Sequence, residues 1–271
     1  MKKALTIAGS DCSGGAGIQA DLKTFGAHGV FGMSAVTSVV AENTVRVISY
    51  QDMTPLIIQE QIEAVFEDIV PEATKIGMLS CVETMNAVAE SLRKWQPKNI
   101  VLDPVMYAKN GAPLMEKNAI QTLIDNVLPL ATVITPNIPE AEEICGETIE
   151  TIEEMEQAAK KIQKMCKTMV LIKGGHKTGE ATDVLYDGKK FYYFTSERID
   201  TKHTHGTGCT FSSAIAANLA LGHSMEQAVK NAKEYVTTAI RYALEIGKGH
   251  GPTNHFHTLY KEGLKEYVNN H

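Results

Sequence analysis

Long apolar segments and an excess of basic residues are both missing from this sequence. No apolar run approaches the roughly 18 residues that a membrane-spanning helix needs. Lysine and arginine together number 26 against 32 aspartates and glutamates, which gives a net charge of −6 at pH 7. Because nucleic acids and anionic membranes attract positively charged surfaces, we expect neither of them as a partner.

Cysteine is sparse, and its spacing shows no pairs. The five cysteines are odd in number and lie far apart, without the short spacings of a zinc site or a redox pair, at positions 12, 81, 145, 166 and 209. The chain begins Met1-Lys2-Lys3, and the apolar run that follows stops at Ser10 and Asp11, too early for a signal peptide. Both features predict a reducing, cytoplasmic location.

Internal repeats, linkers and low-complexity tracts are absent as well. The 271 residues are 44% apolar and 21% charged, which is ordinary for a globular protein with a large core. We therefore expect a single domain over residues 1–271.

Apolar strand-like runs alternate with segments of helical spacing along the chain. The expected strands cover residues 4–8, 33–40, 45–53 (an edge strand), 73–77, 99–103, 131–135 and 168–173, with a hairpin of 181–186 and 190–195 around Asp187-Gly188. The expected helices cover residues 18–25, 56–69, 82–95, 118–127, a segment from 140, 152–166, a segment from 208 to about 221, and 225–244. This alternation predicts an α/β fold, a three-layer αβα sandwich with a mostly parallel central sheet and right-handed crossovers.

The segment Lys202–Ser213 combines a tight turn with the start of a helix. Gly206 and Gly208 flank Thr207, and helical spacing begins after Gly208. The first N–H groups of a helix lack intrahelical partners and carry the positive end of its dipole, so they suit an anion. Cys209 would lie on this first turn, where we expect a lowered thiol pKa. The alternative is a glycine-rich turn before a core helix, with an inert buried cysteine.

A second glycine-rich segment follows the first expected strand, which we expect to end at Gly9. Residues 9–17 contain four glycines but match neither a P-loop nor a G-x-G-x-x-G motif, so they favour the close approach of a flat organic ligand. On the helix that follows, Asp21 is either a solvated carboxylate or a substrate contact.

Polar residues occupy the ends of several expected strands. Pro104 stops one strand directly after Asp103, Lys173 ends another, and Asn137 with Glu140 bridges a strand end and a first helical turn. The carboxyl ends of parallel strands share one edge of a sheet, so these residues should converge with Gly9–Gly17, Glu42 and Gly206–Cys209. Carboxylates and a lysine beside an anion site are the parts that phosphoryl transfer needs.

At these residues the sequence resembles the hydroxymethylpyrimidine/hydroxymethylpyrimidine-phosphate kinases of thiamine biosynthesis, within the ribokinase-like superfamily. The resemblance covers essentially the whole chain. It is carried by Leu5–Asp11 with Ser13–Phe25, Thr74-Lys-Ile-Gly-Met-Leu79, Val101-Leu-Asp-Pro-Val105, Ile134-Thr-Pro-Asn-Ile-Pro-Glu140, Lys173-Gly-Gly-His176, Thr204-His-Gly-Thr-Gly-Cys-Thr210 and Gly249-His-Gly-Pro252.

The resemblance implies an enzyme that transfers a phosphoryl group from ATP, with Mg²⁺, to 4-amino-5-hydroxymethyl-2-methylpyrimidine and then to its monophosphate. By the same likeness, Cys209 stands where most of the superfamily has an aspartate base, and a homodimer is expected. The implied pyrimidine contacts are Gly9, Asp21, Glu42, Met78 and Val105. The expected anion-hole and nucleotide residues are Gly206, Thr207, Gly208, Lys173 and Asn137. The expected metal ligands are Asp103 and Glu140.

One position departs from the family pattern. We expect glutamine at position 42, and this chain has Glu42. An ionised carboxylate accepts from the exocyclic amine of an aminopyrimidine but cannot donate to the ring nitrogen, as glutamine can. One added proton removes this mismatch, and it can reside on the ring or on Glu42.

Three alternative functions stand against this interpretation. The nearest is a pyridoxal kinase of the branch that shares the cysteine. A hydrolase would use Cys209 as nucleophile with His203 or His205, and a regulator would bind nucleotide without turnover. The histidines near the C-terminus, at positions 250, 255 and 257, are either metal ligands or part of a loop that closes over a nucleotide.

Overall fold

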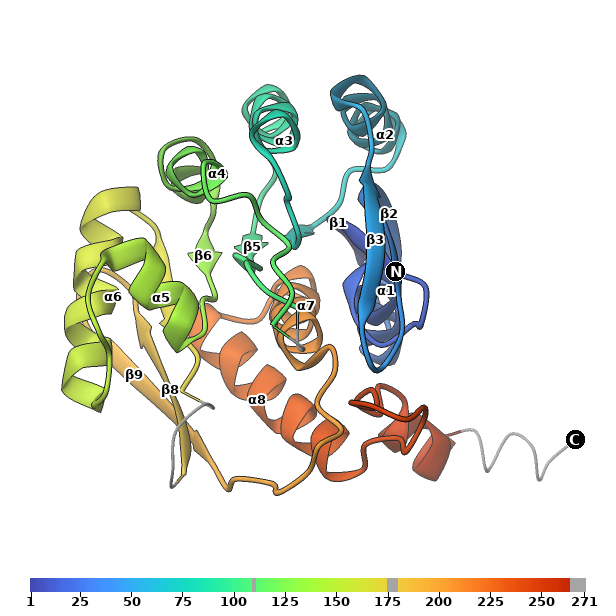
Figure 1. The fold of residues 1–271 in the computed structure, drawn as a ribbon, viewed down its shortest axis with the longest axis vertical. Helices are drawn as coiled ribbons and strands as arrows, with labels where there is room; N and C mark the ends of the chain where they lie inside the picture. The colour runs from blue at the N-terminus through green and yellow to red at the C-terminus, as the bar shows by residue number, and fades with distance from the viewer. Residues whose placement is uncertain (109–110, 175–179, 264–271) are drawn as a thin grey trace, which may run out of the picture.

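The computed structural model describes residues 1–108, 111–174 and 180–263. A single nine-stranded sheet runs through the molecule in the order β3-β2-β1-β4-β5-β6-β7-β8-β9 (Figure 1). Its strands are β1 (Lys3–Asp11), β2 (Phe31–Glu42), β3 (Val47–Asp52), β4 (Ala73–Ile76), β5 (Ile100–Leu102), β6 (Val133–Ile134), β7 (Met169–Ile172), β8 (Ala181–Tyr186) and β9 (Phe191–Ser196). Six neighbouring strands in the middle of the sheet pair in parallel, in the order β2-β1-β4-β5-β6-β7. At the two ends of the sheet, β3, β8 and β9 pair antiparallel. The predicted fold class is confirmed.

Helices cover both faces of the sheet. One face carries α2 (Pro55–Asp68), α3 (Val82–Trp95), α4 (Ala119–Thr122), α5 (Ile138–Cys145) and α6 (Ile152–Cys166), and the other carries α1 (Gly17–Ala27), α7 (Thr207–Ala220) and α8 (Met225–Arg241) (Figure 1). Two hydrophobic clusters fill the spaces between the layers, one on each face. Every residue of α7 from Thr210 to Ala220 is buried, because this helix carries small and apolar side chains on all of its sides. Its N-terminus is thereby fixed against the carboxyl edge of the sheet.

Several boundaries differ from the sequence prediction. Strand β1 continues past Gly9 because Asp11 still pairs with Val40 of β2. Helix α7 already begins at Thr207, so Gly208 lies in its first turn. The helix predicted over residues 118–127 splits into α4 and a wider turn at Leu123–Val127, followed by a short 3-10 turn at Leu128–Leu130. The last predicted helix ends at Arg241, and a further single turn covers Leu259–Gly263. Gly175 and His176 of the Lys173 motif lie outside the described residues.

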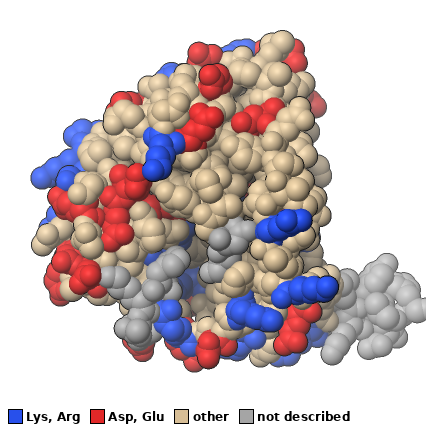
Figure 2. Space-filling view, viewed as in Figure 1, with Lys and Arg blue, Asp and Glu red and all other residues tan. Residues whose placement is uncertain are grey.

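Charges of both signs lie on the face of the molecule shown in Figure 2. Acidic and basic side chains are mixed over the side shown in Figure 2, with acidic groups more frequent near α5 and α6. Within the described ranges, no helix combines the length and apolarity that crossing a membrane would require.

Candidate active site

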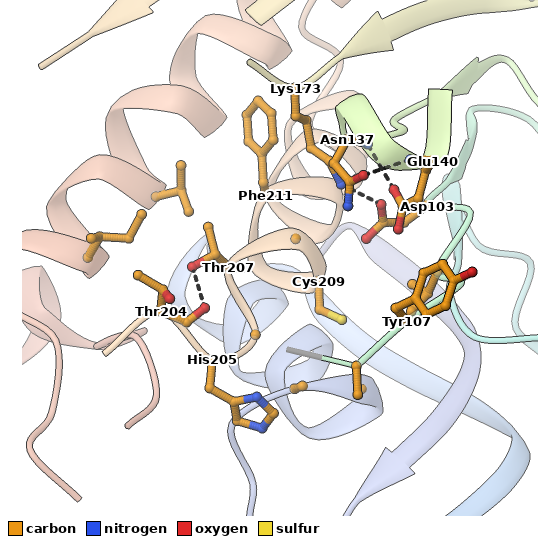
Figure 3. Close-up of a pocket in the computed structure, with 18 of the residues that line it drawn as sticks. Asp103, Tyr107, Asn137, Glu140, Lys173, Thr204, His205, Thr207, Cys209 and Phe211 are labelled. Carbon is orange, nitrogen blue, oxygen red and sulfur yellow. Dashed lines mark hydrogen bonds and ion pairs between the residues drawn. The ribbon is translucent and has the colours of Figure 1, made fainter. Parts of the chain in front are cut away.

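A cavity of about 740 Å³ opens at the carboxyl edge of the parallel strands. Its walls come from the ends of β1 and β2, the loops after β4 to β7, and the first turn of α7 (Figure 3). Of the residues predicted for the site, twelve line it: Gly9, Glu42, Met78, Asp103, Val105, Asn137, Glu140, Lys173, Gly206, Thr207, Gly208 and Cys209. The thirteenth, Asp21, does not.

The N-terminus of α7 points into this cavity. Gly206 is the N-cap residue with a positive φ of 76°, and no side chain caps the helix. A Cβ at Gly206 would collide with the carbonyl oxygen of Gly15, so this close approach requires glycine. The Thr207 hydroxyl turns back to the carbonyl of Thr204 at 2.8 Å. The arrangement leaves the positive end of the helix facing the cavity.

A lysine and two carboxylates stand beside this helix end (Figure 3). Lys173 Nζ donates to Asp103 Oδ1 at 2.7 Å, and Thr135 Oγ1 donates to the same oxygen at 3.1 Å. A Cβ at Gly208 would lie 3.3 Å from Asp103 Oδ2 and 3.5 Å from Lys173 Nζ, so the backbone of α7 passes close to this pair. The predicted convergence of strand ends is therefore present in the geometry.

Asn137 and Glu140 form a capping box at the start of α5. Asn137 Oδ1 accepts from the Glu140 N–H at 2.9 Å, and Glu140 Oε2 accepts from the Asn137 N–H at 2.8 Å. Burial raises the pKa of the Glu140 carboxyl and nearby Asp103 adds to this, while Lys173 opposes it. The local sequence thus holds both side chains rigidly at the cavity wall.

The prediction of a lowered thiol pKa at Cys209 is wrong for the free protein. Burial raises the pKa of Cys209 to about 11, and the carboxylates of Asp21 and Asp103 add to the rise. The Lys75 ammonium and the Gly17 backbone N–H lower the pKa, but they do not compensate for the rise. Removal of water around the sulfur thus outweighs the favourable helix end.

Asp21 is neither a solvated carboxylate nor a cavity residue. Its side chain is fully buried and forms an ion pair with Lys75, at 2.9 Å between Oδ2 and Nζ. The hydroxyls of Thr6 and Ser213 each donate to it at 2.6 Å. These three partners replace the substrate contact that the resemblance implied.

The other end of the cavity is largely apolar. Val40, Met78 and Leu114 form a small cluster against which Val105 packs. A Cβ at Gly9 would lie only 3.1 Å from the sulfur of Met78. Glycine at this position therefore allows the Met78 side chain to pack closely against the end of β1, which makes the space narrow. The result is a slot suited to a flat ring.

Sequence reasoning missed a polar cluster around Glu42. One ligand atom each of Asp11, Glu42 and His205 lies within 4.8 Å of the others, and His205 Nε2 is 2.8 Å from Asp11 Oδ2. Burial raises the pKa of Glu42 to about 7, Asp11 adds to the rise, and His205 opposes it. The N–H groups of Gly15 and Ala16 also donate to Asp11 Oδ2, so this oxygen is saturated by protein donors.

The histidines of the rival readings have other partners. His205 contacts Asp11 rather than Cys209, and His203 Nδ1 accepts from the Gly251 N–H at 3.0 Å. The C-terminal three are likewise engaged separately: His250 with the Lys202 carbonyl, His255 with Thr210, and His257 stacked on Tyr242. The geometry therefore supports neither a Cys–His pair nor a joint site of these three histidines.

The side of the cavity formed by α7 and α8 also contains residues that the sequence did not single out. Phe211, Val236 and Ile240 give it an apolar wall, and Lys233 pairs with Asp183 at 2.8 Å between Nζ and Oδ2. On α7 and α8 these apolar side chains have ordinary helical spacing, so only the packing separates them from core residues.

A parallel sheet with a helix N-terminus, a lysine and carboxylates at its carboxyl edge has the parts of a small-molecule kinase, in agreement with the ribokinase-like resemblance. The phosphomethylpyrimidine kinase family model matches residues 11–254, and the chain belongs to this family. The resemblance drawn from the motifs is confirmed.

Relatives by sequence carry the same description. The hydroxymethylpyrimidine/phosphomethylpyrimidine kinase of Haemophilus influenzae is 49% identical over 94% of this chain and 97% of its own length. A bifunctional thiamine-biosynthesis protein of Geobacter sulfurreducens is 47% identical over 93% of this chain, which spans about half (51%) of that protein.

Solved structures of two kinds are similar to this one. An ADP complex of Bacillus subtilis pyridoxal kinase has a TM-score of 0.88 and 42% identity, covering 96% of this chain and 99% of that one. A phosphomethylpyrimidine kinase of Clostridium difficile has a TM-score of 0.80 and 48% identity, covering 89% and 100%. The fold is therefore shared by kinases of both acceptors.

Proposed function

We propose that this protein phosphorylates 4-amino-5-hydroxymethyl-2-methylpyrimidine and then its monophosphate, with ATP as donor, in thiamine biosynthesis. The observation that carries the proposal is one cavity with an anion-binding helix end, Lys173 and Cys209 on one side and the slot of Gly9, Met78 and Val105 on the other. Family membership supports the reaction and the acceptor.

Each end of the cavity has a distinct task in this proposal. The backbone of Thr207 and Gly208 and the ammonium of Lys173 bind the phosphates, and Asn137 borders that site. The slot orients the ring so that its hydroxymethyl group faces Cys209. Cys209, as the thiolate, accepts the hydroxyl proton during transfer. Glu42, which also lines the cavity, recognises the amino group of the ring.

We further propose that Asp103 and Glu140 hold the divalent cation, Mg²⁺. Two buried carboxylates with one neighbouring lysine supply the oxygen donors that Mg²⁺ prefers. Both already accept hydrogen bonds from protein groups, which suits a cation that keeps part of its water shell. When bound, the cation neutralises charge on the transferring phosphate.

A pyridoxal kinase is the second candidate, favoured by the similarity to solved pyridoxal kinases. The Glu42 carboxyl, which lines the same cavity, argues for an acceptor that presents an amino group to it.

The proposed working form is a single-domain, homodimeric, cytoplasmic enzyme. Edge strand β3 and its neighbour β2 expose large apolar side chains, with Ile48 at 63% and Val39 at 49% exposure, a pattern that a second copy would cover. All five cysteines are free, and Cys209 must stay so to act as a base.

The test is a coupled assay of ADP release with the pyrimidine alcohol, and separately with its monophosphate. We expect turnover with both acceptors, each requiring a divalent cation. If neither the alcohol nor its monophosphate supports ADP release, the proposal is contradicted.

A further inference from the structure

Helices α1 and α7 are joined by a buried contact one turn from Cys209. Ser213 Oγ donates to Asp21 Oδ1 at 2.6 Å, and the backbone N–H of Gly17, at the start of α1, acts to lower the pKa of Cys209. Positions 17 and 21 on α1, like 209 and 213 on α7, are four residues apart, or about 6 Å along a helix. The Asp21 carboxylate therefore lies one layer beneath the Cys209 thiol.

Lys75 enters this layer from β4. Its side chain is fully buried, and Nζ lies 2.9 Å from Asp21 Oδ2. A Cβ at Gly77 would come within 2.7 Å of that nitrogen and 2.9 Å of the Ala8 side chain, so glycine at 77 leaves room for the ammonium. Lys75 also lines the cavity, whereas Asp21 does not. The Lys75 ammonium therefore lies between the Asp21 carboxylate and the cavity.

Four charged side chains act on the Cys209 sulfur. Lys75 favours the thiolate most strongly, and Asp21 and Asp103 oppose it. The fourth, Lys173, is paired with Asp103 at 2.7 Å. Since burial by itself favours the neutral thiol, the thiolate depends on the cation that favours it most, Lys75.

We propose that Lys75, held by Asp21, is a positioning residue whose ammonium stabilises the thiolate of Cys209. Its place in turnover rests on the proposed function. The thiol proton first leaves to solvent. The thiolate then takes the proton of the hydroxymethyl group while that oxygen bonds to the γ-phosphorus of ATP, and the bond between this phosphorus and the bridging oxygen breaks to release ADP. Without the cation, the first of these steps becomes less favourable.

The test measures how fast iodoacetamide modifies Cys209 in Lys75→Met, Asp21→Asn and the double variant. Peptide mass spectrometry follows each cysteine from about pH 7 to about pH 10.5, and exposed Cys12 serves as an internal reference. Below the thiol pKa, the rate changes about tenfold for each unit that this pKa moves. We expect Lys75→Met to slow modification of Cys209 at least about threefold, and Asp21→Asn to accelerate it.

The opposite signs distinguish electrostatic support from structural support. If the pair only supports packing, both single variants change access to Cys209 in the same direction, and that result overturns the proposal. An unchanged rate in Lys75→Met also overturns it. If Lys75→Met does not fold because Asp21 is left unpaired, the alkylation rates of Asp21→Asn and of the double variant still test the proposal. The double variant must react faster than Lys75→Met where that variant folds, and more slowly than Asp21→Asn.

This result is independent of the acceptor. Shifted alkylation without ADP release contradicts the proposed function and leaves the Lys75–Cys209 coupling intact. Normal ADP release with unchanged alkylation rates supports the proposed function and contradicts the Lys75–Cys209 coupling.

Discussion

The ionisable side chains around the cavity differ in how burial and hydrogen bonding balance. At Cys209 burial dominates and the pKa rises to about 11. At Asp11 burial also raises the pKa, but hydrogen bonds from His205 and Ser13 together outweigh it, and the pKa falls well below its usual value. Glu42 lies between these cases at about 7. These side chains differ in the number of donors that reach them.

Replacement of Cys209 by alanine tests its role as base. We expect Cys209→Ala to lower kcat by a factor of about 10² to 10⁴, while nucleotide binding survives. Cys209→Asp should recover part of the activity, since a carboxylate also accepts a proton. Steady-state kinetics with nucleotide titration measures both quantities. Near-wild-type turnover in the alanine variant, or a trapped phosphocysteine, would rule out this role.

The pKa of Glu42 predicts pH-dependent acceptor binding. Below about pH 7 the side chain is protonated, so it donates to the ring nitrogen and accepts from the exocyclic amine. Above that pH the ionised carboxylate faces the ring lone pair and repels it. We expect KM for the pyrimidine alcohol to be lowest near pH 6 and to rise toward pH 9.

Glu42→Gln is the matched control, because an amide donates and accepts at every pH. Its KM profile should be flat over the same range, with kcat little changed. An ultraviolet difference spectrum of the bound pyrimidine separates a neutral from a protonated ring. Parallel KM profiles in the two proteins would exclude Glu42 as the proton-linked group.

At the scale of elements, the first turn of α7 is held by backbone packing rather than by a side-chain cap. Gly206 takes a left-handed conformation against the carbonyl of Gly15, so the loop after β1 and the loop before α7 fit together. The His205–Asp11 contact joins the same two loops. The position of the proposed anion site therefore depends on Gly206 and on the His205–Asp11 contact.

Gly206→Ala should damage both stability and catalysis. The positive φ costs about 1–3 kcal/mol for a residue other than glycine, and the collision with Gly15 adds to this. Gly222→Ala is the control, since Gly222 has a φ of +95° but no atom within 4 Å of the added Cβ. We expect a larger loss of Tm for Gly206→Ala, with a rise in KM for ATP that the control does not share. Equal effects would mean that strain alone is responsible.

At the scale of the whole molecule, one framework serves kinases of different acceptors. The TM-scores of 0.88 and 0.80 to a pyridoxal kinase and a phosphomethylpyrimidine kinase do not separate the two activities. Acceptor choice must therefore depend on the few side chains that line the slot.

We expect this enzyme to prefer the pyrimidine alcohol over pyridoxal by at least about tenfold in kcat/KM, or about 1.4 kcal/mol. Pyridoxal lacks the amino group that Glu42 is placed to recognise. ADP release with each acceptor, at matched concentrations, gives the ratio. Equal or faster turnover of pyridoxal would reverse the assignment.

The proposed dimer has a separate test. Ile48→Glu on edge strand β3 should shift the mass in light scattering from dimer to monomer, because it places a charge in the apolar face. Ile152 of α6, near the other end of the sheet, is a similar apolar side chain with 37% of its surface exposed. The control variant Ile152→Glu should therefore leave the mass unchanged. A monomer in the unaltered protein would contradict the proposal.

The order of strands and helices, and most of the residues at the strand ends, followed from the sequence alone. Periodicity is local, and parallel strands bring their carboxyl ends to one edge, so Asp103, Asn137 and Lys173 could be placed together without coordinates. Helices α3 and α6 begin and end at the predicted residues.

Tertiary structure alone decided the charge states and the buried pairs. Asp21 meets Lys75 from 54 residues away and Asp11 meets His205 from 194, distances over which no local pattern carries information. The pKa of Cys209 could not be read from its helix position, because removal of water by many surrounding residues outweighs the helix end. Spacing along the chain determines which groups reach the cavity, and burial together with long-range pairing determines which of them carry charge there.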